Sequence, residues 1–379
     1  MNQENLENNH TNSNMRKVAL TALAGTSIEW YDFFLYGAAA ALIFPTVFFG
    51  EVPPTTALIL SLLTFAAGFI ARPIGGIIFG HFGDKIGRKK TLISALMLMG
   101  ISSTLIGLLP TYAMIGIAAP ILLTLLRFAQ GLAIGGQWGG AMLLVTESAP
   151  SNQRGYYGAF AQAGAPIGVI LANLALIFTS ALVSEEFFNV WGWRIPFLAS
   201  AVLIIISMYI QLNLEDTKAF KDLAIHRNEQ QGDAKTIIQR SPIIEAIRKY
   251  PKRIILAAGA FLNIQVTFYI LIAFLLAYGV QSAEMTRDDM LASVLIASAI
   301  MVPMQFVFSS YSDKHGRRGI FMLGAVLSGL WAFAIFPLVD TGSFWLIVLA
   351  ITGGLVFLAM MYGPQAAFFT ELFSTEVRY

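Results

Sequence analysis

The sequence predicts an all-helical membrane protein built from two related halves. Three observations carry this prediction: an apolar composition, a series of long apolar runs, and a charged motif that occurs twice. Of the 379 residues, 56% are hydrophobic and only 12% are charged, whereas soluble domains carry about 25% charged residues. Since lipid offers the backbone no hydrogen-bond partners, we expect the apolar runs to be helices.

The repeated motif reads Asp-Lys-x-Gly-Arg and begins at Asp84 and again at Asp313, 229 residues later. A second motif, a Glu followed seven residues later by an Arg, begins at Glu147 and again at Glu371, 224 residues later. Self-similarity at nearly one period indicates a doubled unit, and a doubled unit of about six spans is typical of secondary transporters. Basic loops would also serve orientation alone, but the detailed repeat favours a gating latch. Its expected residues are Gly80, Asp84, Gly87, Arg88, Glu147, Arg154, Asp313, Gly316, Arg317, Glu371 and Arg378.

Ten apolar runs reach the ~20 residues that a helix needs to cross ~30 Å of hydrocarbon. They are 18–44, 55–79, 91–109, 115–145, 156–182, 194–214, 254–279, 290–310, 320–339 and 344–368. The polar, Asn-rich residues 1–17 predict a disordered cytoplasmic tail. The remaining divisions are a six-helix bundle over 18–214, a cytoplasmic linker over 215–253, and a bundle over 254–379 with its first four helices only. About 10 of 12 helices are thus expected, which indicates a truncated second repeat and an incomplete chain.

Basic residues place the N-terminus in the cytoplasm. In that orientation 20 of the 24 Lys and Arg lie on the cytoplasmic side, and acidic residues predominate in the outer loops. Cytoplasmic loops of membrane proteins carry such an excess of Lys and Arg. We therefore predict a multi-pass protein of the cell inner (cytoplasmic) membrane, surrounded by the lipid bilayer.

Five further segments have distinctive sequences. They are Gly-Thr-Ser-Ile-Glu-Trp-Tyr-Asp-Phe-Phe-Leu-Tyr-Gly from Gly25, Arg-Pro-Ile-Gly-Gly from Arg72, Arg-Phe-Ala-Gln-Gly from Arg127, Trp-Gly-Trp-Arg-Ile-Pro-Phe from Trp191, and Tyr-Gly-Pro-Gln-Ala-Ala-Phe-Phe from Tyr362. Together with the segment 80–90, they resemble the metabolite–proton symporter family of the major facilitator superfamily. Members of that family carry shikimate, α-ketoglutarate, citrate or proline and betaine. The resemblance runs from about residue 18 to 379 and implies the major facilitator fold.

The resemblance also implies proton-coupled import of a small organic acid or zwitterion by alternating access. One alternative is an osmolyte symporter for proline or betaine, and another is a membrane sensor with the same fold. An intramembrane enzyme is disfavoured, because the chain has no Cys and its four His lie in predicted cytoplasmic segments. We expect no cofactor, no metal and no nucleic-acid partner, and a monomeric protein. The residues do not distinguish proton from sodium coupling.

Charged side chains inside the predicted spans occur only in the first repeat. They are Glu29, Asp32, Arg72 and Arg127. An ionisable group in hydrocarbon costs at least ~2.5 kcal/mol and should face a partner or a wet cavity. Asp32 lies roughly 21 Å into its span and Arg127 roughly 16 Å from the other side, so a pair near the midplane is possible. We predict a proton-coupling site of Asp32, Arg127 and Glu29; a static ion pair is the alternative.

Other residues are candidates for the substrate path, although many such residues only hydrogen-bond between helices. They are Arg72, Gln130, Gln137, Trp138, Tyr31, Gln162, Asn263, Gln265, Tyr269, Gln305, Tyr362 and Gln365. Gln137 stands where the resembling family commonly has Glu, which favours an anionic substrate over a quaternary amine. The fourth span is rich in glycine, and small residues four apart predict close helix packing.

Overall fold

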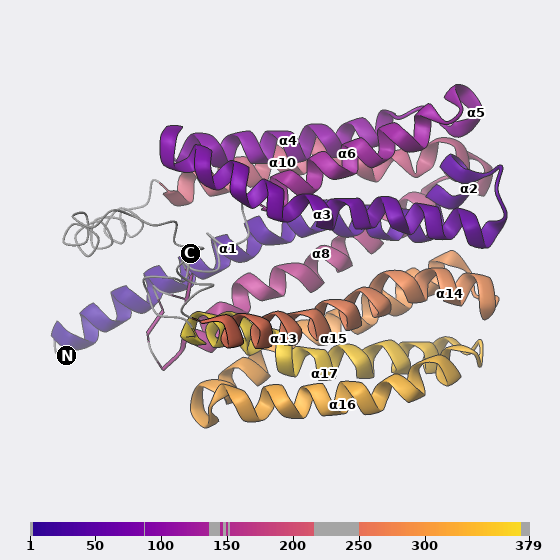
Figure 1. Cartoon of the computed structure of the whole chain (residues 1–379). Helices are drawn as coiled ribbons and strands as arrows, with labels where there is room; N and C mark the ends of the chain where they lie inside the picture. Colours follow the sequence, from indigo (N-terminus) through magenta and orange to yellow (C-terminus); the bar gives the residue numbers. More distant parts are fainter. Residues whose placement is uncertain are drawn as a thin grey trace.

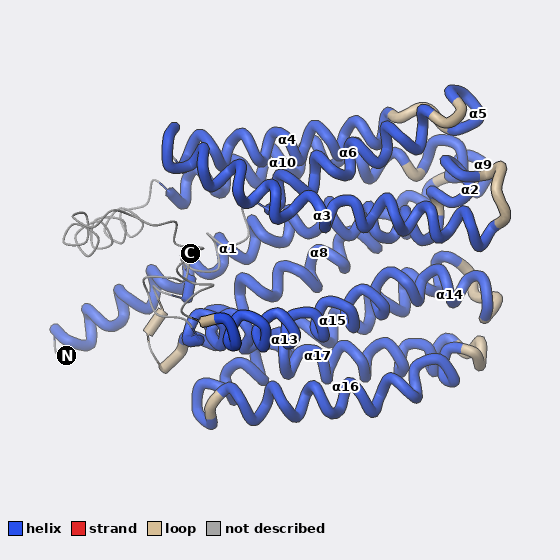
Figure 2. Tube along the Cα trace, viewed as in Figure 1, coloured by secondary structure: helices blue, strands red, loops and turns tan. Residues whose placement is uncertain are grey.

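The computed structural model describes residues 3–86, 88–135, 145–146, 149–150, 152–215 and 250–372. Every regular element of these ranges is a helix (Figure 2). The first half contains α1 (Gln3–Leu42), α2 (Phe44–Phe49), α3 (Pro54–Ile86), α4 (Arg88–Leu108), α5 (Tyr112–Ile115), α6 (Ala118–Gly135), α8 (Arg154–Leu182), α9 (Glu185–Phe187), the π-helix η1 (Phe188–Gly192) and α10 (Arg194–Glu215). The second half contains α13 (Pro251–Tyr269), the π-helix η2 (Ile270–Phe274), α14 (Leu275–Ser282), α15 (Arg287–His315), α16 (Arg317–Val339) and α17 (Phe344–Leu372).

The long helices run side by side and form two bundles (Figure 1). The helices of the first half, drawn from indigo to pink, lie above those of the second half, drawn in orange and yellow, and α8 passes between them. Within the described residues, the main part of each of the ten predicted spans falls on one long helix, or on the continuous series α13–η2–α14; the span 115–145 is described only up to residue 135 and at residue 145. Among the described residues, seven helices are long and apolar enough to cross a membrane. An eighth candidate is a pair of helical segments, Glu185–Gly192 and Arg194–Tyr209, that meet at a bend of 49°.

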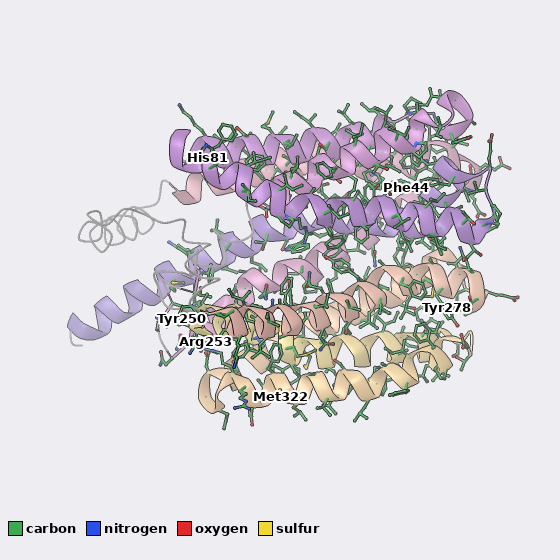
Figure 3. The ribbon with its side chains drawn as sticks, viewed as in Figure 1. Phe44, His81, Tyr250, Arg253, Tyr278 and Met322 are labelled. Atoms are coloured by element: carbon green, nitrogen blue, oxygen red, sulfur yellow. The ribbon has the colours of Figure 1, made fainter. Side chains whose placement is uncertain are left out.

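Residues of the segments that were predicted to be cytoplasmic gather at one end of the bundle. Figure 3 shows His81, Tyr250 and Arg253, which belong to predicted cytoplasmic segments, toward one end of the bundle. Phe44 and Tyr278 lie toward the opposite end. The two halves therefore share one direction across the membrane.

The first helix begins earlier than the sequence predicts. Residues 3–17, expected as part of a disordered tail, are helical and continue α1. Extending an existing helix costs far less than starting one. Met15 and Ala19 of α1 also pack against Val145 and Tyr157, which holds this end in place.

The loops that carry the repeated motif are also shorter than predicted. The segment 80–90 is helical up to Ile86 and again from Arg88, and α15 continues to His315. The turn before α16 is the single residue Gly316, with φ +86°. L-residues with a side chain rarely adopt this conformation, so glycine is required to turn the chain within one residue.

Candidate functional site

Two arginines of the first half meet at one aromatic ring. The guanidinium carbon of Arg127, on α6, lies 4.2 Å from the centroid of the Phe33 ring of α1. That of Arg72, on α3, lies 4.4 Å from the same centroid. Such contacts hold a cation by the negative face of the ring. Arg72, a candidate for the substrate path, thus lies at the same ring as Arg127, a candidate for proton coupling.

Further aromatic side chains surround the two guanidinium groups. Tyr36 and Phe65 lie 4.4 and 4.7 Å from Arg127, and Phe69 lies 4.7 Å from Arg72. Tyr269, at the end of α13 in the second half, packs edge-on against Phe69 with ring centroids 4.8 Å apart. The aromatic cluster thus continues from one half into the other.

Glycines bring α3 and α6 together at these arginines. A Cβ on Gly131 would collide with the backbone of Gly68, and one on Gly135 would collide with the backbone of Arg72. The glycines of the fourth span that the structure describes therefore serve close packing, as the sequence indicates. Close packing of α3 against α6 thus brings the guanidinium groups of Arg72 and Arg127 to the same aromatic ring.

Both arginines keep donors without acceptors. Nη1 of Arg127 donates to Oε1 of Gln130 at 3.1 Å. Its Nε and Nη2, and the Nε and Nη2 of Arg72, are buried and have no hydrogen-bond partner in the described part of the chain. An unpaired buried donor costs about 1–3 kcal/mol, so an acceptor reaching this place would be stabilised.

Asp32, on α1, is 2% exposed and is not bonded to Arg127. Neither of its carboxylate oxygens has a hydrogen-bond partner among the described residues, so the predicted pair is not formed directly in this structure. The groups that act on its charge include the hydroxyls of Ser200 and Ser103 and the guanidinium of Arg127. Helical phase explains the difference, since Phe33 and Tyr36, not Asp32, present their faces to that guanidinium.

The other candidates on α1 have different surroundings. Glu29 is half-buried, and its part in proton coupling stays a prediction. The Tyr31 hydroxyl donates to the backbone oxygen of Pro196 on α10 at 2.9 Å. Tyr31 therefore ties two helices of the first half together, and its part in the substrate path stays a prediction.

Uncharged amides occupy the contact between α8 and the second half. Nε2 of Gln162 donates to the backbone oxygen of Tyr362 at 3.1 Å and to Oε1 of Gln365 at 3.4 Å. Gln305, on α15, is fully buried, and neither its Nε2 nor its Oε1 has a partner in the described residues. Ser309 lies one turn further on and has an unpaired hydroxyl. These four groups bring spare hydrogen-bonding capacity to the middle of the bundle.

The remaining candidates of the second half lie on α13. Asn263 is exposed, and its Nδ2 is 3.6 Å from the sulfur of Met361. Gln265 is half-buried. The Tyr269 hydroxyl is buried without a hydrogen-bond partner within the described ranges. Of the three, only Tyr269 joins the arginine cluster.

Residues of the predicted latch in the second repeat contact one another and the first half. Oδ1 and Oδ2 of Asp313 accept from the backbone N–H groups of Gly155 and Tyr156, both at 2.8 Å. These groups form the N-terminus of α8, where a negative charge is favoured. Arg317 donates to Asp313 at 3.0 Å and grips Glu371 through Nε and Nη2 at 2.9–3.0 Å. The carboxylate of one half is thus bonded to a helix of the other half.

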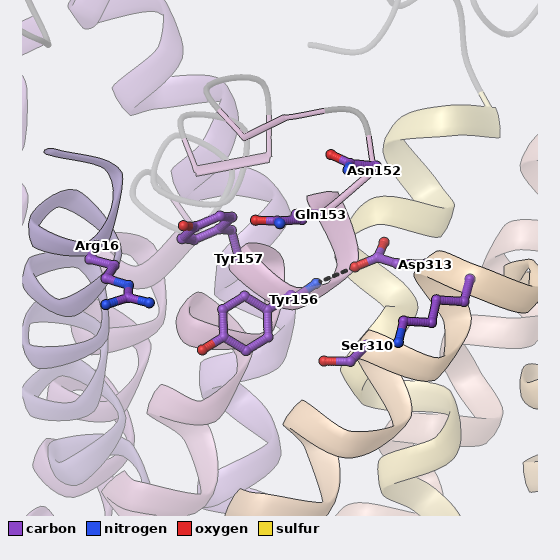
Figure 4. Close-up of a pocket in the computed structure, with 8 residues that line it drawn as sticks. Arg16, Asn152, Gln153, Tyr156, Tyr157, Ser310 and Asp313 are labelled. Atoms are coloured by element: carbon purple, nitrogen blue, oxygen red, sulfur yellow. Dashed lines mark hydrogen bonds between the residues drawn. The ribbon is translucent and has the colours of Figure 1, made fainter. Parts of the chain in front are cut away.

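A cavity of about 520 Å³ lies beside this latch at the cytoplasmic end (Figure 4). It is lined by Arg16, Asn152, Gln153, Tyr156, Tyr157, Ser310, Asp313 and Lys314. The cavity is therefore lined by residues of both halves and shares no lining residue with the arginine pair.

A second contact between the halves lies at the outer end of the same helices. The Ser180 hydroxyl, on α8, donates to Oδ2 of Asp288 at 2.8 Å and accepts from Nη2 of Arg287 at 3.1 Å. The Arg287 guanidinium also lies 4.0 Å from the centre of the Phe188 ring. The structure therefore joins α8 to α15 at both ends.

Some candidates fall outside the described part of the chain. They are Gly87, Gln137, Trp138, Glu147 and Arg378, together with the side chains of Asp84 and Arg88 and most of the linker 215–253. Gly80 lies inside α3 with open space around it, and Arg154 is the first residue of α8.

Sequence inspection missed the uncharged residues of the site. Phe33, Phe65 and Phe69 read as ordinary apolar residues of a span, and Ser103 and Ser200 are indistinguishable from other span serines. The signal that could have found Phe69 is its spacing of three residues from Arg72, which puts both on one helix face.

Two bundles with buried charges, joined by a latch that bridges them, define a membrane transporter. A model of the Major Facilitator Superfamily matches residues 22–378. The fold is similar to that of the xylose transporter XylE from E. coli in a partially occluded inward-open conformation, with a TM-score of 0.69, 17% identity, and coverage of 95% of this chain and 85% of that one. A double-Trp mutant of XylE gives a TM-score of 0.75 at 17% identity, covering 97% of this chain and 84% of that chain.

Curated relatives match over nearly the whole chain. The inner membrane metabolite transport protein YhjE of Escherichia coli (strain K12) is 41% identical, over 98% of this chain and 84% of that protein. The shikimate transporter of the same organism is 38% identical, over 97% and 82%. Its proline/betaine transporter is 35% identical, over 96% and 73%. The chain therefore belongs to the major facilitator superfamily and is a multi-pass membrane transporter, not an enzyme.

Proposed function

We propose that the protein imports a small organic acid together with a proton across the inner membrane. The observation that carries this proposal is the pair of buried guanidinium groups, Arg72 and Arg127, with unpaired donors around Phe33. A carboxylate can accept two parallel N–H···O hydrogen bonds from one guanidinium group. Tyr269, which contributes a further unpaired hydroxyl from the second half, would close the site around the substrate.

The charges inside the spans support coupling to a proton. Glu29 and Asp32 balance Arg72 and Arg127, so a proton on Asp32 leaves a net charge of +1. A carboxylate then restores neutrality, which favours loading both ligands together in a low-dielectric interior. Asp32 is the proposed proton carrier because it is an acid buried inside the bundle, 2% exposed, and neither of its carboxylate oxygens has a hydrogen-bond partner in the described residues.

The relatives agree with a carboxylate as the common recognition element. Shikimate, proline and betaine differ in size and net charge, but each carries one carboxylate. Inner-membrane location follows YhjE, whose name places it there. The 35% identity to a proline/betaine transporter favours one second candidate, a symporter of zwitterionic osmolytes.

Alternating access would use the contacts between α8 and α15. The cytoplasmic latch at Asp313 and the outer contact at Ser180 would open in turn, while the neutral amides of Gln162 and Gln365 exchange partners. Neutral hydrogen bonds can be exchanged for others at a net cost of about 1 kcal/mol each, so the halves can separate without stranding a charge.

Uptake by proteoliposomes tests the proposal. A panel of labelled hydroxy acids, dicarboxylates, proline and betaine is offered with pH and sodium gradients imposed separately. We expect accumulation of at least one organic acid driven by a pH gradient alone. Betaine outcompeting every organic acid would favour the osmolyte symporter, and accumulation driven only by sodium would refute proton coupling.

A further inference from the structure

We propose that a cluster of buried amides and a hydroxyl between the halves binds hydroxyl groups of the substrate, which is therefore a hydroxylated organic acid. The inference rests on the function proposed above and names the class of acid that the protein would carry. The residues of this polar cluster are Gln162 on α8, Gln305 and Ser309 on α15, and Gln365 on α17.

The polar cluster is compact because its members meet at one turn of α17. Nε2 of Gln162 lies 3.4 Å from Oε1 of Gln365. From α15, the Ser309 hydroxyl lies 2.6 Å, and the backbone oxygen of Gln305 2.8 Å, from the position that a Cβ on Gly363 would occupy. Gln305 and Ser309 are four residues apart, which puts both side chains on the face of α15 that meets α17. Glycine at this turn thus lets three helices bring their polar groups together.

The unpaired groups of the polar cluster include both donors and acceptors. Nε2 of Gln365 and Nε2 of Gln305 are buried donors without a hydrogen-bond partner in the described part of the chain. Oε1 of Gln162 and Oε1 of Gln305 are buried acceptors in the same condition, and the Ser309 hydroxyl is unpaired as well. All four side chains are at most 1% exposed. Because buried polar groups of native proteins are almost always hydrogen-bonded, the cluster requires further partners.

The mixture of donors and acceptors selects the chemistry of those partners. A carboxylate only accepts, so it would leave the two amide oxygens unpaired. A metal cation or a quaternary amine cannot accept, so either would leave the two amide nitrogens unpaired. A hydroxyl group both donates and accepts, and therefore satisfies both kinds of group at once. Hydroxyl groups of a substrate, with water in their place when the substrate is absent, fit the cluster.

The polar cluster lies close enough to the arginine pair for one small molecule to reach both. At 1.5 Å per residue, the cluster lies roughly 9–15 Å from the cytoplasmic ends of its helices and Arg72 roughly 21 Å from that of α3, a difference of about one to two helix turns. Aromatic contacts join the two levels. The Tyr362 ring, beside the cluster, stacks on Phe268 at 6.1 Å, and the rings of Phe268 and Tyr269 are 5.9 Å apart. Tyr269 in turn lies 6.0 Å from Phe33, the ring that both arginines contact.

The substrate would thus be held by two kinds of group. Its carboxylate would accept from the arginines of the first half, and its hydroxyls would exchange hydrogen bonds with the amides between the halves. Betaine offers no hydroxyl to the polar cluster, so the unpaired amides favour a hydroxylated acid over a quaternary amine.

Isothermal titration calorimetry of the purified chain in detergent tests the subsite without requiring transport. The ligands are pairs of acids that differ only in hydroxyl groups: shikimate with 1-cyclohexene-1-carboxylate, glycerate with propionate, and tartrate with succinate. The hydroxylated member of at least one pair should bind at least ~10-fold more tightly, because it gains neutral hydrogen bonds that its partner lacks. Gln305→Met should remove most of this ratio and Ser309→Ala a part of it. Affinity for the unhydroxylated member should stay within about 2-fold of the wild type, since that acid makes no hydrogen bond to the cluster.

One matched control addresses the loss of a buried hydroxyl as such. Ser328→Ala removes an unpaired, buried hydroxyl from α16, which packs mainly on α17, and should leave the ratio unchanged. Retained affinity for the unhydroxylated acid shows that each variant is folded.

Two results would overturn the subsite. One is equal affinity within every pair that binds. The other is an undiminished ratio in both Gln305→Met and Ser309→Ala, which would show that the polar cluster holds water only. A neutral polyol, myo-inositol, separates this proposal from the proposed function: binding that is lost in Gln305→Met, with no acid binding, would keep the hydroxyl subsite and refute transport of organic acids. Absence of binding by every acid and by myo-inositol would overturn both.

Discussion

The two halves of this transporter are helix bundles of the same orientation, but the polar groups buried inside them differ. In the described first half, charged groups lie inside the bundle, with Asp32 and Arg127 almost inaccessible to solvent. In the second half, the buried polar groups at the same contact are amides and hydroxyls such as Gln305, Ser309 and Gln365. The difference suggests a division of tasks. The first half holds groups that can bind a proton or an anion. The second half offers neutral hydrogen-bond partners, which can be exchanged at a small free-energy cost when the halves move.

Removing a charge from the first half should have the largest effect. Arg127→Ala deletes the proposed anion partner and leaves Asp32 without a compensating cation, and breaking a buried charge interaction costs about 3–5 kcal/mol. We expect the initial rate of uptake to fall at least ~100-fold, measured on equal amounts of reconstituted protein. Arg127→Lys keeps the charge but loses the planar guanidinium, so its uptake rate should lie between those of the wild type and Arg127→Ala. Full activity of Arg127→Ala would contradict the assignment.

Neutralising the acid should separate coupling from translocation. Asp32→Asn cannot change its charge, so accumulation driven by a pH gradient should disappear while exchange of labelled for unlabelled substrate continues within several-fold of the wild type. The two assays on one vesicle preparation distinguish the effects. Undiminished gradient-driven accumulation would move the proton site elsewhere, with Glu29 as the next candidate.

The bridge between the halves should give a smaller effect. Asp313→Asn weakens the capping of α8, which is worth about 0.5–2 kcal/mol, so the cytoplasmic end should open more often by roughly 2- to 30-fold. The chain has no natural cysteine, so a cysteine introduced at Ser310, beside the latch cavity, reports opening by its rate of labelling. Asp340→Asn is the control, since the Asp340 carboxylate accepts from the hydroxyl of Tyr278, which belongs to its own half. Equal labelling rates in Asp313→Asn and the control would show that the latch does not close the cytoplasmic end.

Changing a neutral group of the second half should have the smallest effect. Gln365→Ala removes one long hydrogen bond to Gln162, and a neutral hydrogen bond contributes about 0.5–1.5 kcal/mol. We expect a 2- to 10-fold change in KM for uptake with proton coupling intact. A loss of proton coupling in Gln365→Ala would contradict the proposal that only the first half carries the coupling groups.

The contacts of the second repeat's motif could be predicted from the sequence more closely than the surroundings of Asp32. Asp313, Arg317 and Glu371 belong to repeated motifs, and a motif of fixed spacing determines local geometry at a helix end. The Asp32–Arg127 pair was inferred from depth in the membrane, and depth does not specify the rotation of one helix against another. Depth likewise did not predict that the Tyr31 hydroxyl bonds to α10.

The sequence by itself determined that this protein is a membrane transporter of two related halves. It also determined that the charged residues inside the predicted spans lie in the first half. Hydropathy, the distribution of basic residues and the internal repeat depend on the chain alone, because the bilayer acts on every segment in the same way. Only the tertiary structure decided which side chains meet. Close packing of α3 on α6 at glycine placed Arg72 and Arg127 at one aromatic ring, and Gln130 joined Arg127 to Ser103 of α4. Helix rotation and side-chain packing settle such contacts, and both depend on all the neighbouring helices at once.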